Sequence, residues 1–384
     1  MKKIFIIALS YIILVINSNL LAQEKDKLLK VGLLAPLTGE YEELGKSLLY
    51  SLQLALEEIG DEKIYIVPRD AGFNNKVKLN KAIRDLNSEG IKIFIGPISN
   101  NDFKEVKKFS NSVFISPSNI SPDFDGNVVS VGVSLESQLI SLNNFLKKQK
   151  KKKTVIMLPK NNYTDLIEKK IEDLELNFFK IFKYNPDPQV LTGEIEVLTN
   201  YSQRKRNLEL KKKLFEDKED SQSVRQLEKL EQLYTLGEVN FDSLIIIDFG
   251  NNLKSVLTSL VYADVDPDKV LFTTVNQWFD KSIFYENTIK KLYYPSINFK
   301  QFTKYNEKYF KKFKSYPNEI TILTYDALGL IYYVWKKNED INSLNDFSFK
   351  NKIKGKIGTF SFKDKKVIQD LDIYKVENNK FTKY

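Results

Sequence analysis

Cysteine and histidine are both absent from the 384 residues of the chain. Without them the chain has no disulfide, no thiolate nucleophile, no histidine-based catalytic triad and no ordinary ligand set for zinc, copper or haem. Carboxylates, lysines, tyrosines and hydroxyls are what remain for chemistry. We therefore expect a protein that is not an enzyme and that carries no cofactor and no metal ion.

A strong excess of one charge is also absent. The chain has 59 basic and 50 acidic residues, a net charge of +9, while its apolar fraction of 42% is enough to bury a sizeable core. The densest basic run, KKQKKKK at 147–153, has no aromatic residues interleaved with it. It fits a solvated helix end better than a contact with nucleic acid or an anionic membrane, so no nucleic-acid partner is expected.

The first 22 residues have the pattern of an export signal. Lys2 and Lys3 precede an apolar run from Ile4 to Ile16, and the small residue Ala22 follows a polar stretch. The run is too short to span a bilayer, which takes about 20 residues, so a cleaved secretory signal peptide is predicted at 1–22. A retained N-terminal anchor is the alternative. No cysteine follows for lipid attachment, so we expect a soluble periplasmic protein without a transmembrane segment after cleavage.

Beyond residue 28, short β-branched runs alternate with amphipathic stretches, which is typical of α/β layering with parallel sheets. Strands are predicted at 29–34, 64–68, 91–95, 113–115, 128–133, 154–158, 177–184, 243–247 and 270–274, and in the tail at 354–362 and 372–376. Helices are predicted at 45–59, 76–89, 101–110, 137–148, 165–174, 252–262, 300–314 and 321–337.

The segment 200–238 interrupts this regular alternation. It carries many charges of both signs and no strand pattern, and its apolar residues, among them Leu208, Leu227 and Leu230, mostly recur at helical spacings. Structureless loops of this length are uncommon in compact domains. Two helices joined near Asp217 are therefore predicted, as an insertion.

Five segments follow one another in a distinctive order: VGLLAPLTGEYEELGKSLLYSLQLALEEI (31–59), IKIFIGPIS (91–99), VFISPSN (113–119), TYDALGLI (324–331) and GKIGTFSFKD (355–364). In this order they resemble the leucine-binding family of type I periplasmic binding proteins. The resemblance implies two Rossmann-like lobes of the Venus-flytrap kind. It places lobe 1 at 28–134 plus 281–344 and lobe 2 at 135–280 plus 345–384, with the helical insertion at 200–238.

A second set of motifs lies between 198 and 280. A charged helical stretch, LTNYSQRKRNLELKKKL, precedes a strand that begins with Phe-Asp, and Y-x-x-V-D-P and T-x-x-x-W-x-D follow. This order resembles the penicillin-binding protein activator branch of the same superfamily. The lipoprotein members of that branch carry an anchoring cysteine, which this chain lacks. The matching positions are Phe241, Asp242, Tyr262, Val265, Asp266, Pro267, Thr274, Trp278 and Asp280.

Polar residues that follow the predicted strands would line a ligand cleft, because free N–H groups at helix N-termini and nearby hydroxyls attract carboxylates. Each of them also fits a helix cap or a turn. Amino-acid-binding members of the family that the chain resembles use an acidic residue for the α-ammonium group, and the resemblance implies this role for Asp248. Trp278 could close over a ligand or pack in the core. The candidate cleft residues are Thr38, Tyr41, Ser99, Asn100, Ser116, Ser118, Asn119, Tyr163, Asp248, Asn251 and Trp278.

Two functions are consistent with this resemblance. One is an envelope regulator that contacts a peptidoglycan synthase, which the insertion favours. The other is a substrate-binding protein that delivers an amino acid or a related small ligand to an ABC permease, which the polar strand ends favour. Many transport-linked members have Arg-Thr after the strand at 128–133, whereas Val133 and Ser134 stand here. The standard amino-acid site is therefore weakened, and an enzyme is the least supported alternative.

Overall fold

The computed structural model describes residues 27–118, 126–277, 290–318, 320–349, 351–356, 358–363, 366–378 and 380–384. The predicted leader at 1–22 lies outside them. The chain divides into two compact units. Unit 1 contains the described residues up to Ser116, then 126–128 and Thr324–Phe347, and unit 2 contains the rest. Within the described ranges, no helix is at once long enough and apolar enough to span a bilayer.

Unit 1 is built around a sheet whose strand order is β2-β1-β3-β4-β5. The pairings of β1 with β2 and β3, and of β3 with β4, are parallel, as the alternation of strand and helix patterns predicted. The strands are β1 (Leu29–Ala35), β2 (Ile64–Asp70), β3 (Ile93–Ile95), β4 (Val113–Ser116) and β5 (Val128–Ser130).

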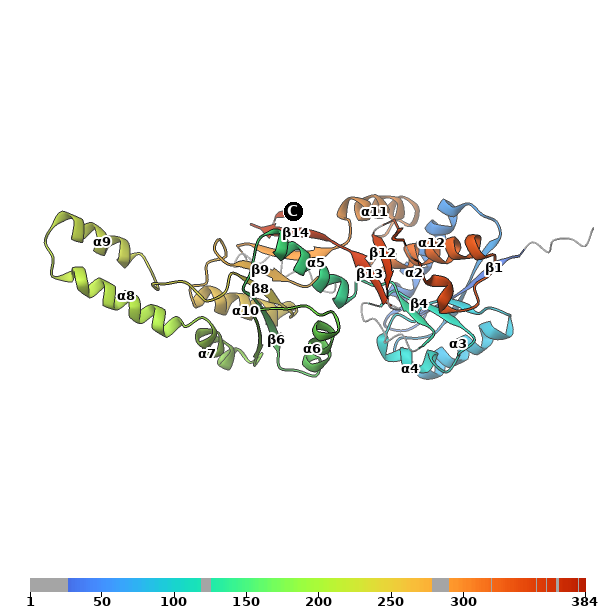
Figure 1. The fold of residues 1–384 in the computed structure, drawn as a ribbon. Helices are drawn as coiled ribbons and strands as arrows, with labels where there is room; N and C mark the ends of the chain where they lie inside the picture. The colour runs from blue at the N-terminus through green and yellow to red at the C-terminus, as the bar shows by residue number, and fades with distance from the viewer. Residues whose placement is uncertain are drawn as a thin grey trace, which may run out of the picture. The chain divides into compact units, whose positions relative to one another are not determined.

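Helices cover this sheet, with α3 and α4 together on one face (Figure 1). On that face the rings of Phe94 and Phe114 stack with their centroids 4.9 Å apart, and Leu79 and Ile83 of α3 are fully buried. Such burial of large apolar side chains is the main source of stability in a layered fold. The helices are α2 (Glu42–Ile59), α3 (Lys76–Ser88), α4 (Phe103–Val106) and α12 (Thr321–Asn338).

Unit 2 contains a sheet of seven strands in the order β15-β14-β10-β9-β8-β6-β7. The pairings from β7 to β10 are parallel, and those of β14 with β10 and β15 are antiparallel. The strands are β6 (Thr154–Pro159), β7 (Lys180–Tyr184), β8 (Ser243–Ile246), β9 (Leu271–Thr274), β10 (Leu292–Ser296), β14 (Asp372–Glu377) and β15 (Lys380–Lys383). A separate antiparallel sheet contains β11 (Ile353–Lys354), β12 (Thr359–Lys363) and β13 (Lys366–Asp370).

The central strands of unit 2 are buried on both faces, which explains their continuous apolar runs. Along β6, Val155 and Met157 belong to one core cluster, whereas Ile156 and Leu158 belong to the other. The first cluster includes residues of α7 and α10, and the second includes residues of α5 and α6. The helices of this unit are α5 (Leu135–Lys148), α6 (Thr164–Asp173), α7 (Pro188–Leu198), α8 (Tyr201–Glu216), α9 (Ser221–Glu231), α10 (Gly250–Tyr262) and α11 (Phe299–Phe313).

Strand β10 was not among the predicted strands. It lies within 281–344, which the sequence assigned to lobe 1, and it pairs here with β9 and β14 of the unit 2 sheet. Leu292, Tyr293 and Tyr294 are all buried. A run of only five residues that ends in Pro-Ser gives too little periodicity to be separated from a loop by pattern alone.

Candidate functional site

In unit 1, the residues after β1 form a hydrogen-bonded group around Asp70, the last residue of β2. Thr38 donates from Oγ1 to Asp70 Oδ2 at 2.6 Å, and Lys78 Nζ donates to the same oxygen at 2.8 Å and to Thr38 Oγ1 at 2.7 Å. The backbone N–H of Leu37 donates to Asp70 Oδ1 at 2.9 Å. The predicted cleft residue Thr38 is therefore engaged by its own unit.

The same contacts set the charge state of Asp70. Partial burial alone would raise its pKa, but hydrogen bonds from Lys78, Thr38 and two backbone N–H groups outweigh that effect and lower the pKa to about 2. Asp70 is thus ionised at neutral pH and forms an ion pair with Lys78. The side chains of both partners are partly exposed.

The turn after β3 contains a second polar group. Ser99 is buried and donates from Oγ to Asn74 Oδ1, which also accepts a hydrogen bond of 3.4 Å from Asn101 Nδ2. The backbone N–H of Asn101 donates to Ser99 Oγ at 3.2 Å, so Ser99 stabilises the start of the short 3-10 helix that contains Asn100. Ser99 therefore makes the local contact that a cap would make, and its place in a ligand cleft stays a prediction.

The other predicted residues of unit 1 also have internal partners. The exposed ring of Tyr41 stacks on Phe73 with 4.2 Å between the ring centroids. Ser116, at the end of β4, is fully buried and donates from Oγ to the carbonyl oxygen of Pro97 at 2.5 Å. The hydroxyl of Ser116 thus joins the ends of two neighbouring strands.

In unit 2, Asp248 follows β8 and is 5% exposed. Tyr184, at the end of β7, donates from its hydroxyl to Asp248 Oδ2 at 2.6 Å, and the backbone N–H of Phe249 donates to Oδ1 at 2.8 Å. Gln277 donates from Nε2 to the Asp248 carbonyl at 3.0 Å and accepts from the N–H of Gly250 at 3.1 Å. A closed polar network therefore surrounds the first turn of α10.

Burial governs the electrostatics of Asp248. Desolvation raises its pKa, because the charged form is disfavoured away from water. Hydrogen bonds from Tyr184, Phe249 and Asn252 oppose the rise without cancelling it. Both carboxylate oxygens of Asp248 already accept hydrogen bonds, one from Tyr184 and one from the backbone. Binding of an external ammonium group is disfavoured while these bonds are in place.

Two predicted residues of unit 2 are exposed near strand ends. Tyr163 is 60% exposed just before α6, and Asn251 is exposed in the first turn of α10, next to Phe249, which is 56% exposed. Strands β6 and β8, which precede these two helices, are neighbours in the sheet. Exposed aromatic and amide side chains therefore lie near the carboxyl ends of two adjacent strands.

The remaining predictions have different outcomes. Ser118 is buried, and its carbonyl accepts a hydrogen bond from the hydroxyl of Ser130. Asn119 and Trp278 lie outside the described residues. Sequence reasoning did not identify Asp70, Tyr184 or Gln277, which are the partners that organise these groups. Within the described ranges, no cluster of three or more acidic side chains is placed to hold a metal ion.

The insertion in unit 2 forms a helical arm, defined here as α8 and α9 with their connection. Figure 1 shows the arm extending away from the sheet of its own unit. Arg204 fixes its base: the guanidinium donates to the carbonyls of Ala263, Asp264 and Gly237 at 3.0, 2.8 and 3.1 Å, and to Thr235 Oγ1 at 2.7 Å. Since Ala263 caps α10, a buried cation sits where the dipole of that helix favours one.

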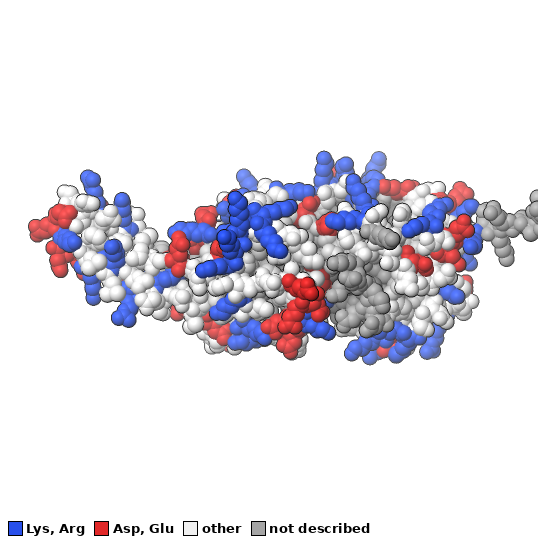
Figure 2. Space-filling model, viewed as in Figure 1, with Lys and Arg blue, Asp and Glu red and all other residues white. Residues whose placement is uncertain are grey.

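Further along the arm, most side chains are exposed. Leu208 and Leu230 are buried where the two helices meet near the base, whereas Leu210 and Leu214 are 53% and 59% exposed. Figure 2 shows basic side chains along the arm and acidic ones gathered at its tip, which is the connection between α8 and α9. The arm is therefore anchored at its base and presents a mixed apolar and charged surface to solvent.

The first part of the chain matches a known family. Residues 29–173 fit the family model described as periplasmic binding protein. An uncharacterized protein of Methanocaldococcus jannaschii is 32% identical over 113 residues, which cover 26% of this chain and 26% of that protein. The chain thus spans about a quarter of the length of that curated relative.

Solved structures share the fold over nearly the whole chain. The C-domain of LpoA from Haemophilus influenzae, a regulator of PBP1A, gives a TM-score of 0.61 at 14% identity, with coverage of 92% of this chain and 99% of that one. Full-length LpoA gives 0.62 at 14% identity, and the match covers 93% of this chain but only 59% of LpoA. A substrate-binding protein of an ABC transporter from Desulfitobacterium hafniense, in complex with Leu, gives 0.58 at 16% identity, with coverage of 93% and 99%. These likenesses confirm the predicted fold.

Proposed function

Because the chain has the fold of the type I periplasmic binding proteins, we propose that it is a non-enzymatic protein of the cell envelope that regulates a peptidoglycan synthase, in the manner of a penicillin-binding protein activator. The observation that carries the proposal is the helical arm, whose base is fixed by Arg204 and whose outer part exposes Leu210 and Leu214. Exposed leucines on a helix pair that is anchored at its base suit a protein partner better than a small ligand, because they offer apolar area that a partner surface can bury.

The polar groups at the strand ends support the same proposal. Thr38, Ser99 and Asp248 already have hydrogen-bond partners within their own units. A site that must release and recapture a zwitterion would exchange these bonds for bonds to the ligand, at a cost in affinity. The likeness to the LpoA C-domain, which extends over almost the full length of both chains, agrees with a regulatory role.

The experiment replaces the outer part of the arm, residues 209–229, with a short Gly/Ser connector. Leu208 and Leu230, which are buried near the base, and the anchor Arg204 are kept. Surface loops tolerate such changes because closure entropy varies slowly with length. We expect the variant to keep its thermal melt and to lose crosslinking to a synthase in intact envelopes.

Point variants give a matched comparison. The double substitution Leu210→Ser and Leu214→Ser changes two exposed leucines of the arm, and Val77→Ser changes an 80% exposed residue on α3 of unit 1. We expect the first to weaken crosslinking and the second to leave it unchanged. Normal crosslinking in the connector variant would refute the regulatory proposal.

A substrate-binding protein of an ABC permease is the second candidate. The exposed aromatic and amide surface formed by Tyr163, Phe249 and Asn251 at neighbouring strand ends favours it. Under this alternative, an amino-acid-like ligand raises the melting temperature, and Asp248→Ala or Ser118→Ala removes that stabilisation. If crosslinking is also independent of the arm, this alternative replaces the first proposal.

A further inference from the structure

Helix α11 has one buried face and one exposed face. Phe302, Tyr305 and Tyr309 are buried along one side of the helix. The start of the helix is fixed to β14, because the backbone N–H of Phe299 donates to the hydroxyl of Tyr374 at 2.7 Å. These contacts hold α11 against its own unit and leave the opposite face to solvent.

The exposed face carries a row of lysines. Lys300, Lys304 and Lys311 are all exposed, and their spacing places them on one line along the helix, over about 16 Å. None of the three side chains makes an ion pair or a hydrogen bond with the part of the chain that the structure describes. Figure 2 shows long basic side chains standing out from the surface over α11. From 299 to 316 the sequence has six lysines and one acidic residue, Glu307, so positive charge dominates this segment.

Aromatic side chains flank the lysine row. Phe299 and Phe310 each precede a lysine of the row, so they lie about 100° around the helix from it, both on the same side. Phe310 is 40% exposed, and its ring stacks on that of Tyr316 with 4.8 Å between the centroids. Tyr316 lies just beyond the helix and is 74% exposed. The stacked pair therefore offers apolar area to solvent directly beside unpaired lysines.

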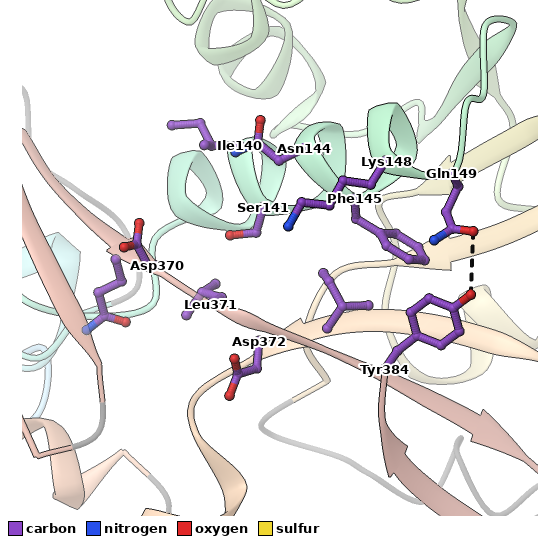
Figure 3. A pocket seen from close by; sticks show the side chains of 12 residues that line it. Ile140, Ser141, Asn144, Phe145, Lys148, Gln149, Asp370, Leu371, Asp372 and Tyr384 are labelled. Carbon is purple, nitrogen blue, oxygen red and sulfur yellow. Dashed lines mark hydrogen bonds between the residues drawn. The ribbon is translucent and has the colours of Figure 1, made fainter.

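The other basic run of this unit, at 147–153, differs from α11 in both respects. It has no aromatic residues interleaved with its lysines. Figure 3 shows Lys148 beside a pocket whose opposite wall includes Asp370 and Asp372. Carboxylates thus share that lining with a lysine of the run, whereas α11 combines unpaired charge with exposed rings.

This combination indicates the chemistry of a partner. Lysines near an anionic bilayer each add to the attraction, and aromatic rings favour the level of the lipid headgroups. The convex outer face of a helix touches a flat surface along its length, whereas single-stranded nucleic acid is held in a groove. The envelope location proposed above also places a bilayer within reach.

We propose that the outer face of α11 docks on the surface of a bilayer that contains anionic lipids. Lys300, Lys304 and Lys311 lie over the headgroup phosphates, and the rings of Phe310 and Tyr316 enter the headgroup layer. The docking is peripheral and reversible, because such contacts are much weaker than the insertion of a spanning helix. It uses residues outside the helical arm, so it holds whether or not the arm binds a synthase.

The test measures binding of the purified protein to vesicles by co-sedimentation. Anionic vesicles contain phosphatidylcholine and phosphatidylglycerol at about 2:1, and neutral vesicles contain phosphatidylcholine alone. We expect binding to the anionic vesicles that falls as salt is raised from about 50 to about 500 mM, and little binding to the neutral ones. All variants have the same N-terminus, so the predicted leader contributes equally to each.

Substitutions test the charges and the rings separately. Lys300→Gln, Lys304→Gln and Lys311→Gln together should weaken binding to anionic vesicles about a hundredfold and flatten its salt dependence. Phe310→Ser and Tyr316→Ser together should weaken binding about tenfold and keep the salt dependence, because the charges remain. All five positions are exposed, so both variants should melt at the temperature of the wild type.

The basic run at 147–153 supplies the matched control. Lys147→Gln, Lys148→Gln and Lys152→Gln together remove the same charge from exposed positions of the same unit and should weaken binding less than about threefold. Equal losses in the two triple variants, wild-type binding by the α11 variant, or no binding to anionic vesicles would each overturn the proposal. Single-stranded DNA that binds as tightly as the vesicles, and does so only with the α11 lysines in place, would identify a polyanion site and overturn it as well.

Discussion

The hydroxyl of Tyr184 donates a hydrogen bond of 2.6 Å to Oδ2 of Asp248, across the carboxyl end of the unit 2 sheet. The two residues are 64 positions apart in the chain and both are buried. Burial raises the pKa of Tyr184, and the charge of Asp248 and the hydrogen bond to it raise the pKa further, so the phenol remains protonated and a donor at every pH of interest. Asp248 is thus held by its own unit.

Replacing Asp248 with asparagine tests this relationship through pH. Because burial raises the folded-state pKa of Asp248, the folded protein holds the proton more tightly than the unfolded chain. Its contribution to stability is therefore complete below the ordinary value of 3.8 and is lost as pH rises through the folded-state pKa. Asp248→Asn still accepts from Tyr184 but has no charge to bury. We expect its urea midpoint, relative to wild type, to rise between pH 4 and neutrality; a difference independent of pH would contradict this account.

Asp70 should have the opposite dependence on pH. Its folded-state pKa is lowered from 3.8 to about 2, so it stabilises the fold above about pH 4 and loses that contribution as pH falls towards 2. After allowance for its partial exposure, Asp70→Asn should lose about 1–2 kcal/mol at neutral pH and little near pH 2. Chemical denaturation at both pH values measures this. Asp85→Asn, at an exposed position of α3, is the control and should change stability little at either pH.

Arg204 is expected to be the most sensitive position of the helical arm. Arg204→Ala leaves the buried carbonyl of Ala263 and the partly buried carbonyls of Asp264 and Gly237 without their donor. The loss should be about 2–4 kcal/mol of unfolding free energy, because buried hydrogen bonds to a charged group are strong and leaving partners unpaired is costly. Arg206→Ala, on the exposed face of the same helix, should change it by less than about 0.5 kcal/mol. Equal effects would mean that the arm is not rooted through Arg204.

Two glycines should respond oppositely to a single methyl group. A Cβ atom at Gly45, in the first turn of α2, would lie 2.0 Å from the carbonyl oxygen of Pro36, so Gly45→Ala forces the turn after β1 to move and should destabilise by several kcal/mol. A Cβ atom at Gly193, within α7, meets nothing within 4 Å. Gly193→Ala should stabilise by about 0.5–1 kcal/mol through helix propensity. Thermal denaturation of both variants measures these changes, and a shift of the melting temperature in the same direction for both would contradict the prediction.

The periodic parts of the fold could be predicted from the sequence. The apolar spacing of Leu208, Leu227 and Leu230 was enough to predict two helices in the insertion, and α8 and α9 are found there. Helix α7 was missed, although Leu191, Ile195 and Leu198 recur at helical spacing and form its buried face. Asp187-Pro188 is a second signal that could have found it, since Asp187 caps the helix by accepting from Gln189 N–H and proline favours the first helical position.

The partners of the strand-end residues could not be predicted. Thr38, Ser116 and Asp248 were recognised as polar residues after strands. Their hydrogen-bond partners are Asp70, Pro97 and Tyr184, which are 19 to 64 positions away in the chain. A hydroxyl after a strand has the same local pattern whether it faces a ligand or a neighbouring carboxylate. Which of the two the hydroxyl faces depends on the order of the strands in the sheet. A single sequence does not specify that order.

Helix α10 contacts the polar network around Asp248 at one end and the base of the helical arm at the other. Its first turn carries the network of Asp248 and Gln277, and the carbonyl at its other end, that of Ala263, accepts from Arg204 of the arm. Thirteen residues of helix span about 20 Å, and such a rod is stiff along its axis. The anchor of the arm and the polar network at the strand ends are therefore held by the two ends of one helix, about 20 Å apart.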